Sequence, residues 1–185
     1  MMSPGFDRIL PPFRRHFPTI RFVLLTFGLL VVAYWVLHRP TVVRSIVAPY
    51  TAFVASVSGG LLRLVGVSAQ SHGAVISSPG FSVAIRSVCN GLEVTAIFIA
   101  AVLAFPVGWR SKLVGVAVGY TAVFLVNILR IVVLFLIGLH MPNVFESAHY
   151  YYAQGFVILV TAIVWVVWVS VCTRRTPAGD TRAAA

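Results

Sequence analysis

The fold of this chain is decided by the stretch Thr121-Ala-Val-Phe-Leu-Val-Asn127-Ile-Leu-Arg130-Ile-Val-Val-Leu-Phe-Leu-Ile137. Asn127 and Arg130 interrupt a run that is otherwise almost entirely apolar, and the run is long enough for a membrane-spanning helix. A guanidinium is costly to bury in a bilayer and does not lose its charge. We therefore interpret the stretch as a transmembrane helix and Arg130 as a functional residue.

The composition indicates an integral membrane protein. Of the 185 residues, 59% are hydrophobic and 10% are charged, and the mean hydropathy is +0.97. The 14 Lys and Arg outnumber the 4 Asp and Glu, but they flank apolar segments and form no groove-lining cluster with interleaved aromatic residues. We therefore exclude a nucleic-acid partner and interpret the cations as topology signals. Residues 1–185 are predicted to form a single membrane domain.

Four apolar segments predict transmembrane helices, over about residues 20–37, 92–107, 113–139 and 153–171. We expect the first to be retained rather than cleaved, because bulky residues and Arg39 follow it instead of a small-residue cleavage site. The tail over residues 174–185 is predicted to be disordered.

Residues 41–66 allow two interpretations. Their apolar residues recur at helical spacing, but Pro49 and Gly59-Gly60 interrupt them and Arg44 and Arg63 bracket them. This pattern favours an amphipathic helix lying in the membrane interface, with a full span as the alternative. An interfacial helix would leave nine Lys and Arg on the cytoplasmic side, whereas a full span would move the last two basic clusters outside.

The stretch that follows predicts a small β-hairpin on the outer face. Phe81, Val83 and Ile85 alternate with small or polar residues, and Ser78-Pro79-Gly80 has turn chemistry. The predicted fold class is an all-α integral membrane protein with four transmembrane helices, an interfacial amphipathic helix and this outer-face hairpin.

Cys89, Arg130 and His149 are predicted to lie at one membrane level, the outer boundary. A thiolate at Cys89 would be favoured by the N-terminal dipole of the helix that follows Asn90 and by a nearby cation. His149 could accept the thiol proton and return it to a leaving amine, and Arg130 could stabilise an oxyanion. These residue types predict a membrane-embedded thiol enzyme.

Two further side chains are candidates for supporting roles. Asn127 lies one helical turn before Arg130, so it could orient the guanidinium or donate to the same oxyanion. Glu93 lies one turn after Cys89 and could hold Arg130 or His149 in place.

Each of these residues also has an ordinary explanation. Cys89 alone could be a structural cysteine, His149 an interfacial histidine, and Arg130 the structural partner of Glu93. On that hypothesis the chain would be a non-enzymatic transporter subunit or an assembly scaffold. The sequence contains no Cys-x-x-Cys, His-Glu-x-x-His or Gly-rich phosphate loop, so we predict neither a metal nor another cofactor.

Four motifs resemble the exosortase/archaeosortase family, and most closely exosortase H. They are Ser87-Val-Cys89-Asn90-Gly-Leu-Glu93, Leu103-Ala-Phe-Pro-Val-Gly-Trp-Arg110, Asn127-Ile-Leu-Arg130-Ile and Phe145-Glu-Ser-Ala-His149. The resemblance extends over about residues 73–169. The chain departs from most members in having Asn90 where they have Ser, and in having fewer spans.

The resemblance implies a multi-pass cysteine enzyme of the bacterial inner membrane, with Cys89, Arg130 and His149 as its catalytic residues on the periplasmic side. It implies cleavage, and transfer to an acceptor, of exported proteins that carry a C-terminal signal. That signal comprises a short motif, a transmembrane helix and a basic tail. For exosortase H the implied motif is of the Ile-Pro-Thr-Leu type.

Overall fold

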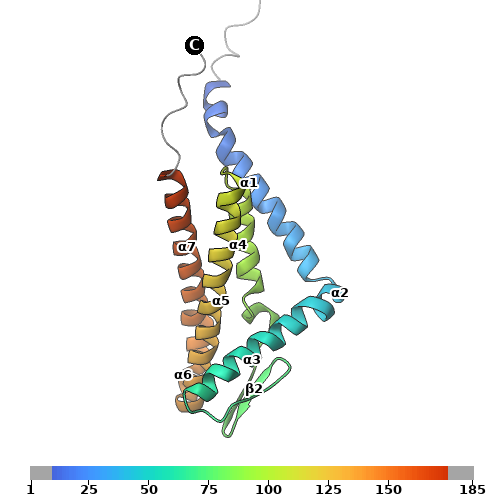
Figure 1. Ribbon diagram of the computed structural model, residues 1–185, viewed down its shortest axis with the longest axis vertical. Coiled ribbons are helices and arrows are strands. Elements are labelled where there is room, and N and C mark those ends of the chain that lie inside the picture. The colour runs from blue at the N-terminus through green and yellow to red at the C-terminus, as the bar shows by residue number, and fades with distance from the viewer. Residues whose placement is uncertain (1–9, 175–185) are drawn as a thin grey trace, which may run out of the picture.

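The computed structural model describes residues 10–174, and the side chains in that range except those of residues 10–18, 88, 150 and 151. Four helices, α1 (Leu10–Leu37), α4 (Leu92–Ala104), α5 (Trp109–His140) and α7 (Gln154–Arg174), make the long axis of the molecule, with α4, α5 and α7 packed together and α1 slanting away (Figure 1). The helical membrane fold class is thus confirmed. Of the tail that was predicted to be disordered, over residues 174–185, Arg174 is the last residue of α7, and residues 175–185 lie outside the described residues.

Four helical segments of the described chain are long and apolar enough to cross a membrane, and this number matches the prediction. The set differs in one member, because the segment over residues 40–64 qualifies and α4 does not. The four segments cover Thr19–Leu37, Pro40–Leu64, Trp109–His140 and Gln154–Arg174. Helix α4 has 13 residues, about 20 Å at 1.5 Å per residue, which is short of a hydrocarbon core of about 30 Å. It ends before Pro106, where the prediction continued to residue 107.

The helical segment over residues 40–64 is oriented differently from the bundle. It comprises α2 (Pro40–Val42), a π-helical turn (Val43–Val47) and α3 (Ala48–Leu64), and Figure 1 shows it running obliquely across one end of the bundle. Its buried residues recur at three- and four-residue spacing and so form one face: Thr51, Val54, Ala55, Ser58, Gly59 and Leu62. The oblique course agrees with an interfacial helix, although its length also permits a span. The interfacial location stays a prediction.

A small antiparallel sheet packs between α3 and α5. Its strands are β1 (Gln70–His72), β2 (Val75–Ser78) and β3 (Phe81–Ala84), in the order β1-β2-β3. The predicted hairpin is β2–β3, whose turn contains Gly80 at φ 97°, a left-handed conformation that suits glycine. The sequence analysis missed β1. A cluster of buried apolar residues joins α3, the sheet and α5 and includes Val54, Leu62, Ile76, Ile131 and Phe135.

The two ends of the molecule differ in chemistry. Figure 1 shows the start of α1, the connection from α4 to α5 and the end of α7 at one end, and α3, the sheet and α6 (Pro142–Ser147) at the other. Arg110, Lys112 and Arg174 therefore lie at the first end, and Cys89, which precedes α4, lies at the second. The basic loop and the thiol are separated by the length of the bundle.

Candidate active site

Cys89, Arg130 and His149 meet in one cavity, although they come from three separate parts of the chain. The Sγ of Cys89 lies 3.8 Å from the Nε2 of His149, and the Nη2 of Arg130 donates to the same Sγ at 3.9 Å. The cavity has a volume of about 220 Å³ and is also lined by Arg86 and Glu146. The structure thus brings together the three residues that were predicted to converge.

The turn that presents Cys89 is built from local backbone features. Cys89 ends a 3-10 turn (Ser87–Cys89), and Gly91, at φ 85°, connects that turn to α4. The Oδ1 of Asn90 accepts a hydrogen bond from the backbone N–H of Leu92 at 2.9 Å, which satisfies one of the unpaired donors at a helix start. Asn90 therefore fixes the backbone directly after the thiol.

The other end of the Asn90 amide is held by α3. The Nδ2 of Asn90 donates to the Oγ1 of Thr51 at 2.8 Å. The Thr51 hydroxyl in turn donates to the carbonyl of Val47 at 2.7 Å. Asn90 is fully buried, and Thr51 is nearly so. The sequence analysis did not find Thr51, because nothing in the sequence places α3 beside Cys89.

The site contains a buried positive charge. Arg130 is 6% exposed, and its Nε has no hydrogen-bond partner among the described residues. Burial lowers the pKa of His149 from its ordinary value, and the charge of Arg130 lowers it further. The imidazole is therefore favoured in its neutral form, which can accept a proton.

Asn127 lies behind the site rather than in its cavity. Its side chain is buried, and both of its amide atoms lack a hydrogen-bond partner among the described residues. A Cβ on Gly91 would lie 3.0 Å from the Cγ of Asn127, so the nucleophile turn packs directly against this amide. The geometry supports a packing role for Asn127 and shows no hydrogen bond between its amide and Arg130.

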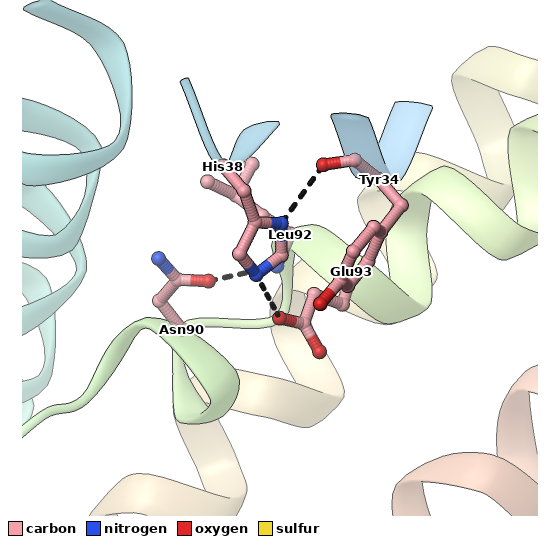
Figure 2. A network of polar contacts seen from close by, with 5 residues as sticks. All are labelled: Tyr34, His38, Asn90, Leu92 and Glu93. Atoms are coloured by element: carbon pink, nitrogen blue, oxygen red, sulfur yellow. Dashed lines mark hydrogen bonds and ion pairs between the residues drawn. The ribbon is translucent and has the colours of Figure 1, made fainter. Parts of the chain in front are cut away.

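Glu93 makes a different contact from the two that were predicted. Its Oε1 lies 4.0 Å from the Nε2 of His38, and the Nδ1 of that imidazole lies 2.8 Å from the carbonyl of Tyr34 (Figure 2). Glu93 was expected to hold Arg130 or His149 in place. In the structure it instead connects the first turn of α4 to the end of α1. Both side chains are more than 40% exposed, so the contact contributes little energy.

Comparison with known protein families assigns the chain to one of them. The family model described as Transmembrane exosortase (Exosortase_EpsH) matches residues 16–169. The chain belongs to the transmembrane exosortase family. The match includes α3, the sheet, Cys89, Arg130 and His149, and it supports a membrane-embedded function of the exosortase type. Searches of curated proteins and of solved structures gave no match.

Proposed function

We propose that this exosortase is a cysteine peptidase and transpeptidase that cleaves the C-terminal sorting signals of exported proteins. One observation carries the proposal: the thiol of Cys89 is within 4 Å of both an imidazole nitrogen and a guanidinium nitrogen, inside a cavity. Nucleophile, base and cation within reach of one reacting atom are the parts that acyl transfer needs.

The first half of the reaction forms a thioester. The Sγ of Cys89 attacks the scissile carbonyl carbon while the Nε2 of His149 takes the thiol proton. Arg130 stabilises the negative charge on the carbonyl oxygen. The C–N bond then breaks, His149 gives its proton to the leaving amine, and the helical tail of the signal departs.

The second half releases the acyl group. An acceptor amine or hydroxyl, or water, gives a proton to His149 and attacks the thioester carbonyl, and the C–S bond breaks. The protonated imidazole of His149 then returns this proton to the thiolate of Cys89. An amine or hydroxyl acceptor gives transpeptidation or ester transfer, and water gives hydrolysis.

The proposed setting is the bacterial inner membrane, with the active site facing the periplasm. Its support is the separation of the basic Arg110, Lys112 and Arg174 from the end that carries Cys89, because basic clusters favour the cytoplasmic side. The proposed partners are exported proteins that carry a short motif, a transmembrane helix and a basic tail. The bilayer places such a helix beside the enzyme and the motif at its outer boundary.

The competing hypothesis is a scaffold or transporter subunit in which Arg130 pairs with Glu93. The observed partner of Glu93 is His38, so the geometry does not favour that pairing.

Co-expression with a substrate that bears a motif, a helix and a basic tail tests the proposal. The unmodified enzyme should shorten the substrate, and Cys89→Ser should leave it full-length while inserting normally, because a hydroxyl without a strong base is a poor nucleophile. Cys172→Ser, at the far end of α7, is the matched control and should process normally. Processing by Cys89→Ser would reject the thiol mechanism.

A further inference from the structure

We propose that the outer edge of β3 binds the substrate's sorting motif as an added β-strand. This inference rests on the proposed function and deepens it, because it states in which conformation and against which residues the motif is held. It follows from the strand order, the register and the lining of the cavity.

Strand β3 is at an edge of the sheet in the described chain, since the order is β1-β2-β3. A sheet edge carries backbone N–H and C=O groups that have no strand to pair with, and such an edge is a template for an extended peptide. The opposite edge, β1, packs against α3, where the Oγ of Ser71 donates to the carbonyl of Ala55 at 3.1 Å.

The register indicates which backbone groups face outward. The backbone N–H of Ile85 donates to the carbonyl of Ala74 at 2.8 Å, and Val75 pairs with Ala84. In an antiparallel pair, residues that bond to the partner alternate with residues that point away from it. The N–H and C=O of Ala84 therefore point away from β2, at the outer edge.

The cavity begins beside this part of the edge. Near the start of β3, α5 passes so closely that a Cβ on Gly138 would collide with the ring of Phe81. Further along, the residues from Val83 to Arg86 line the cavity together with Cys89, Arg130 and His149. A peptide paired with Ala84 would thus lie in the same cavity as the thiol.

The chain between β3 and the thiol is also extended. Arg86 has φ −79° and ψ 159°, and its carbonyl accepts a hydrogen bond from the backbone N–H of Cys89 at 2.8 Å. Only a short turn therefore separates the edge from the nucleophile. The part of the cavity's lining that comes from α5 includes the apolar Ile131, Leu134 and Phe135, which suits a motif with apolar side chains.

Disulfide cross-linking tests the paired conformation without needing catalysis. Ala84→Cys is combined with Cys89→Ala and Cys172→Ser, and single cysteines are moved through the motif of a co-expressed substrate. Because side chains of a strand alternate between faces, cross-links should form at every second motif position. His72→Cys, on the opposite edge of the sheet, is the matched control and should give none.

The pattern of cross-links decides the outcome. Cross-links three or four residues apart, at all positions alike, or at none would overturn strand pairing. Processing by the unmodified enzyme is scored in parallel. If processing occurs without the alternating pattern, the edge proposal fails and the proposed function stands; if the pattern occurs without processing, the proposed function fails.

A second test removes one backbone donor. Ala84→Pro deletes an N–H that faces away from β2, and proline is tolerated at such edge positions, so the β2–β3 pairing should persist. Processing should fall about tenfold or more, because a substrate carbonyl loses its donor in a partly buried site. Processing within about threefold of the parent enzyme by an Ala84→Pro variant that inserts normally would overturn the proposal.

Discussion

The Sγ of Cys89 and the Nε2 of His149 lie 3.8 Å apart, although 60 residues separate them in the chain. Cys89 reaches this position through the turn before α4, and His149 through the π-helical turn (Ala148–Ala153) that precedes α7. Burial and the charge of Arg130 both lower the pKa of His149 below its ordinary value of 6.5. The residue is therefore neutral, and able to take the thiol proton, over a wider range of pH than an exposed histidine.

The first prediction concerns pH. Loss of activity on the acid side should follow protonation of His149, and because its pKa is lowered from 6.5, the midpoint of this loss should lie below pH 6.5. Arg130→Gln removes the positive charge, which is one of the two causes that lower the pKa of His149. The acid limb of this variant's residual activity should therefore move to higher pH. Arg130→Lys keeps the charge, so its acid limb should stay nearer to that of the unmodified enzyme. The measurement is initial processing rate against pH in isolated membranes. An acid limb with its midpoint above pH 6.5 in the unmodified enzyme would contradict the assignment of His149 as the base.

A second prediction concerns topology. A membrane-impermeant maleimide applied to intact spheroplasts should label Cys89 and spare Cys172, because the thiol lies at the end of the bundle opposite Arg110, Lys112 and Arg174. Single-cysteine variants, each keeping one of the two thiols, assign the label by mass. Labelling of Cys172 without Cys89 would place the site in the cytoplasm.

Much of the fold could be predicted because bilayer spans depend on local hydropathy. The apolar runs gave the helices, and the Ser78-Pro79-Gly80 turn gave the β2–β3 hairpin. Strand β1 was missed because Gln70–His72 is short and polar, and it forms only against β2 and α3. Helix α4 ends early because Pro106 cannot continue a helix. The predicted span continued to residue 107 because it was drawn from hydropathy alone.

The sequence could predict which site residues share a membrane level. It could not predict contacts that depend on how the helices pack. Cys89, Arg130 and His149 were placed at one level from the sides that the basic clusters assign to the helix ends and from the rise along the helix that carries Arg130. Glu93 was assigned by its spacing from Cys89 along α4, but the end of α1 supplies His38 as its partner. Thr51 has no signal in the sequence, since its contact with Asn90 depends on how α3 crosses the bundle.

A third prediction separates catalysis by Arg130 from ion pairing. Arg130→Lys keeps the charge but loses the planar fork, so processing should fall by roughly a hundredfold, comparable to the loss of an oxyanion-hole donor. Glu93→Gln should insert normally and process within about threefold of the parent, because its contact with His38 is exposed. The measurement is processed substrate per unit of inserted enzyme. Near-normal processing by Arg130→Lys together with poor insertion of Glu93→Gln would make Arg130 a structural partner instead.

The last prediction concerns Thr51, whose hydroxyl accepts a hydrogen bond from Asn90, the residue after the thiol. Thr51→Val keeps the shape of the side chain but leaves the buried Nδ2 of Asn90 without its acceptor, at a cost of about 1–3 kcal/mol. We expect the Cys89-Asn90-Gly91 turn to loosen and processing to fall about tenfold or more, whereas Thr51→Ser keeps the hydroxyl and should restore most of the activity.

Pairing with Asn90→Ala makes this a double-mutant cycle. If Thr51 acts through Asn90, adding Thr51→Val to Asn90→Ala should cost little more, because the amide that needed the hydroxyl is already gone. Processing per inserted enzyme and thermal stability in detergent are measured for each member. Equal activity of Thr51→Val and Thr51→Ser, or additive losses in the double variant, would mean that the contact from α3 packs the turn without positioning the nucleophile.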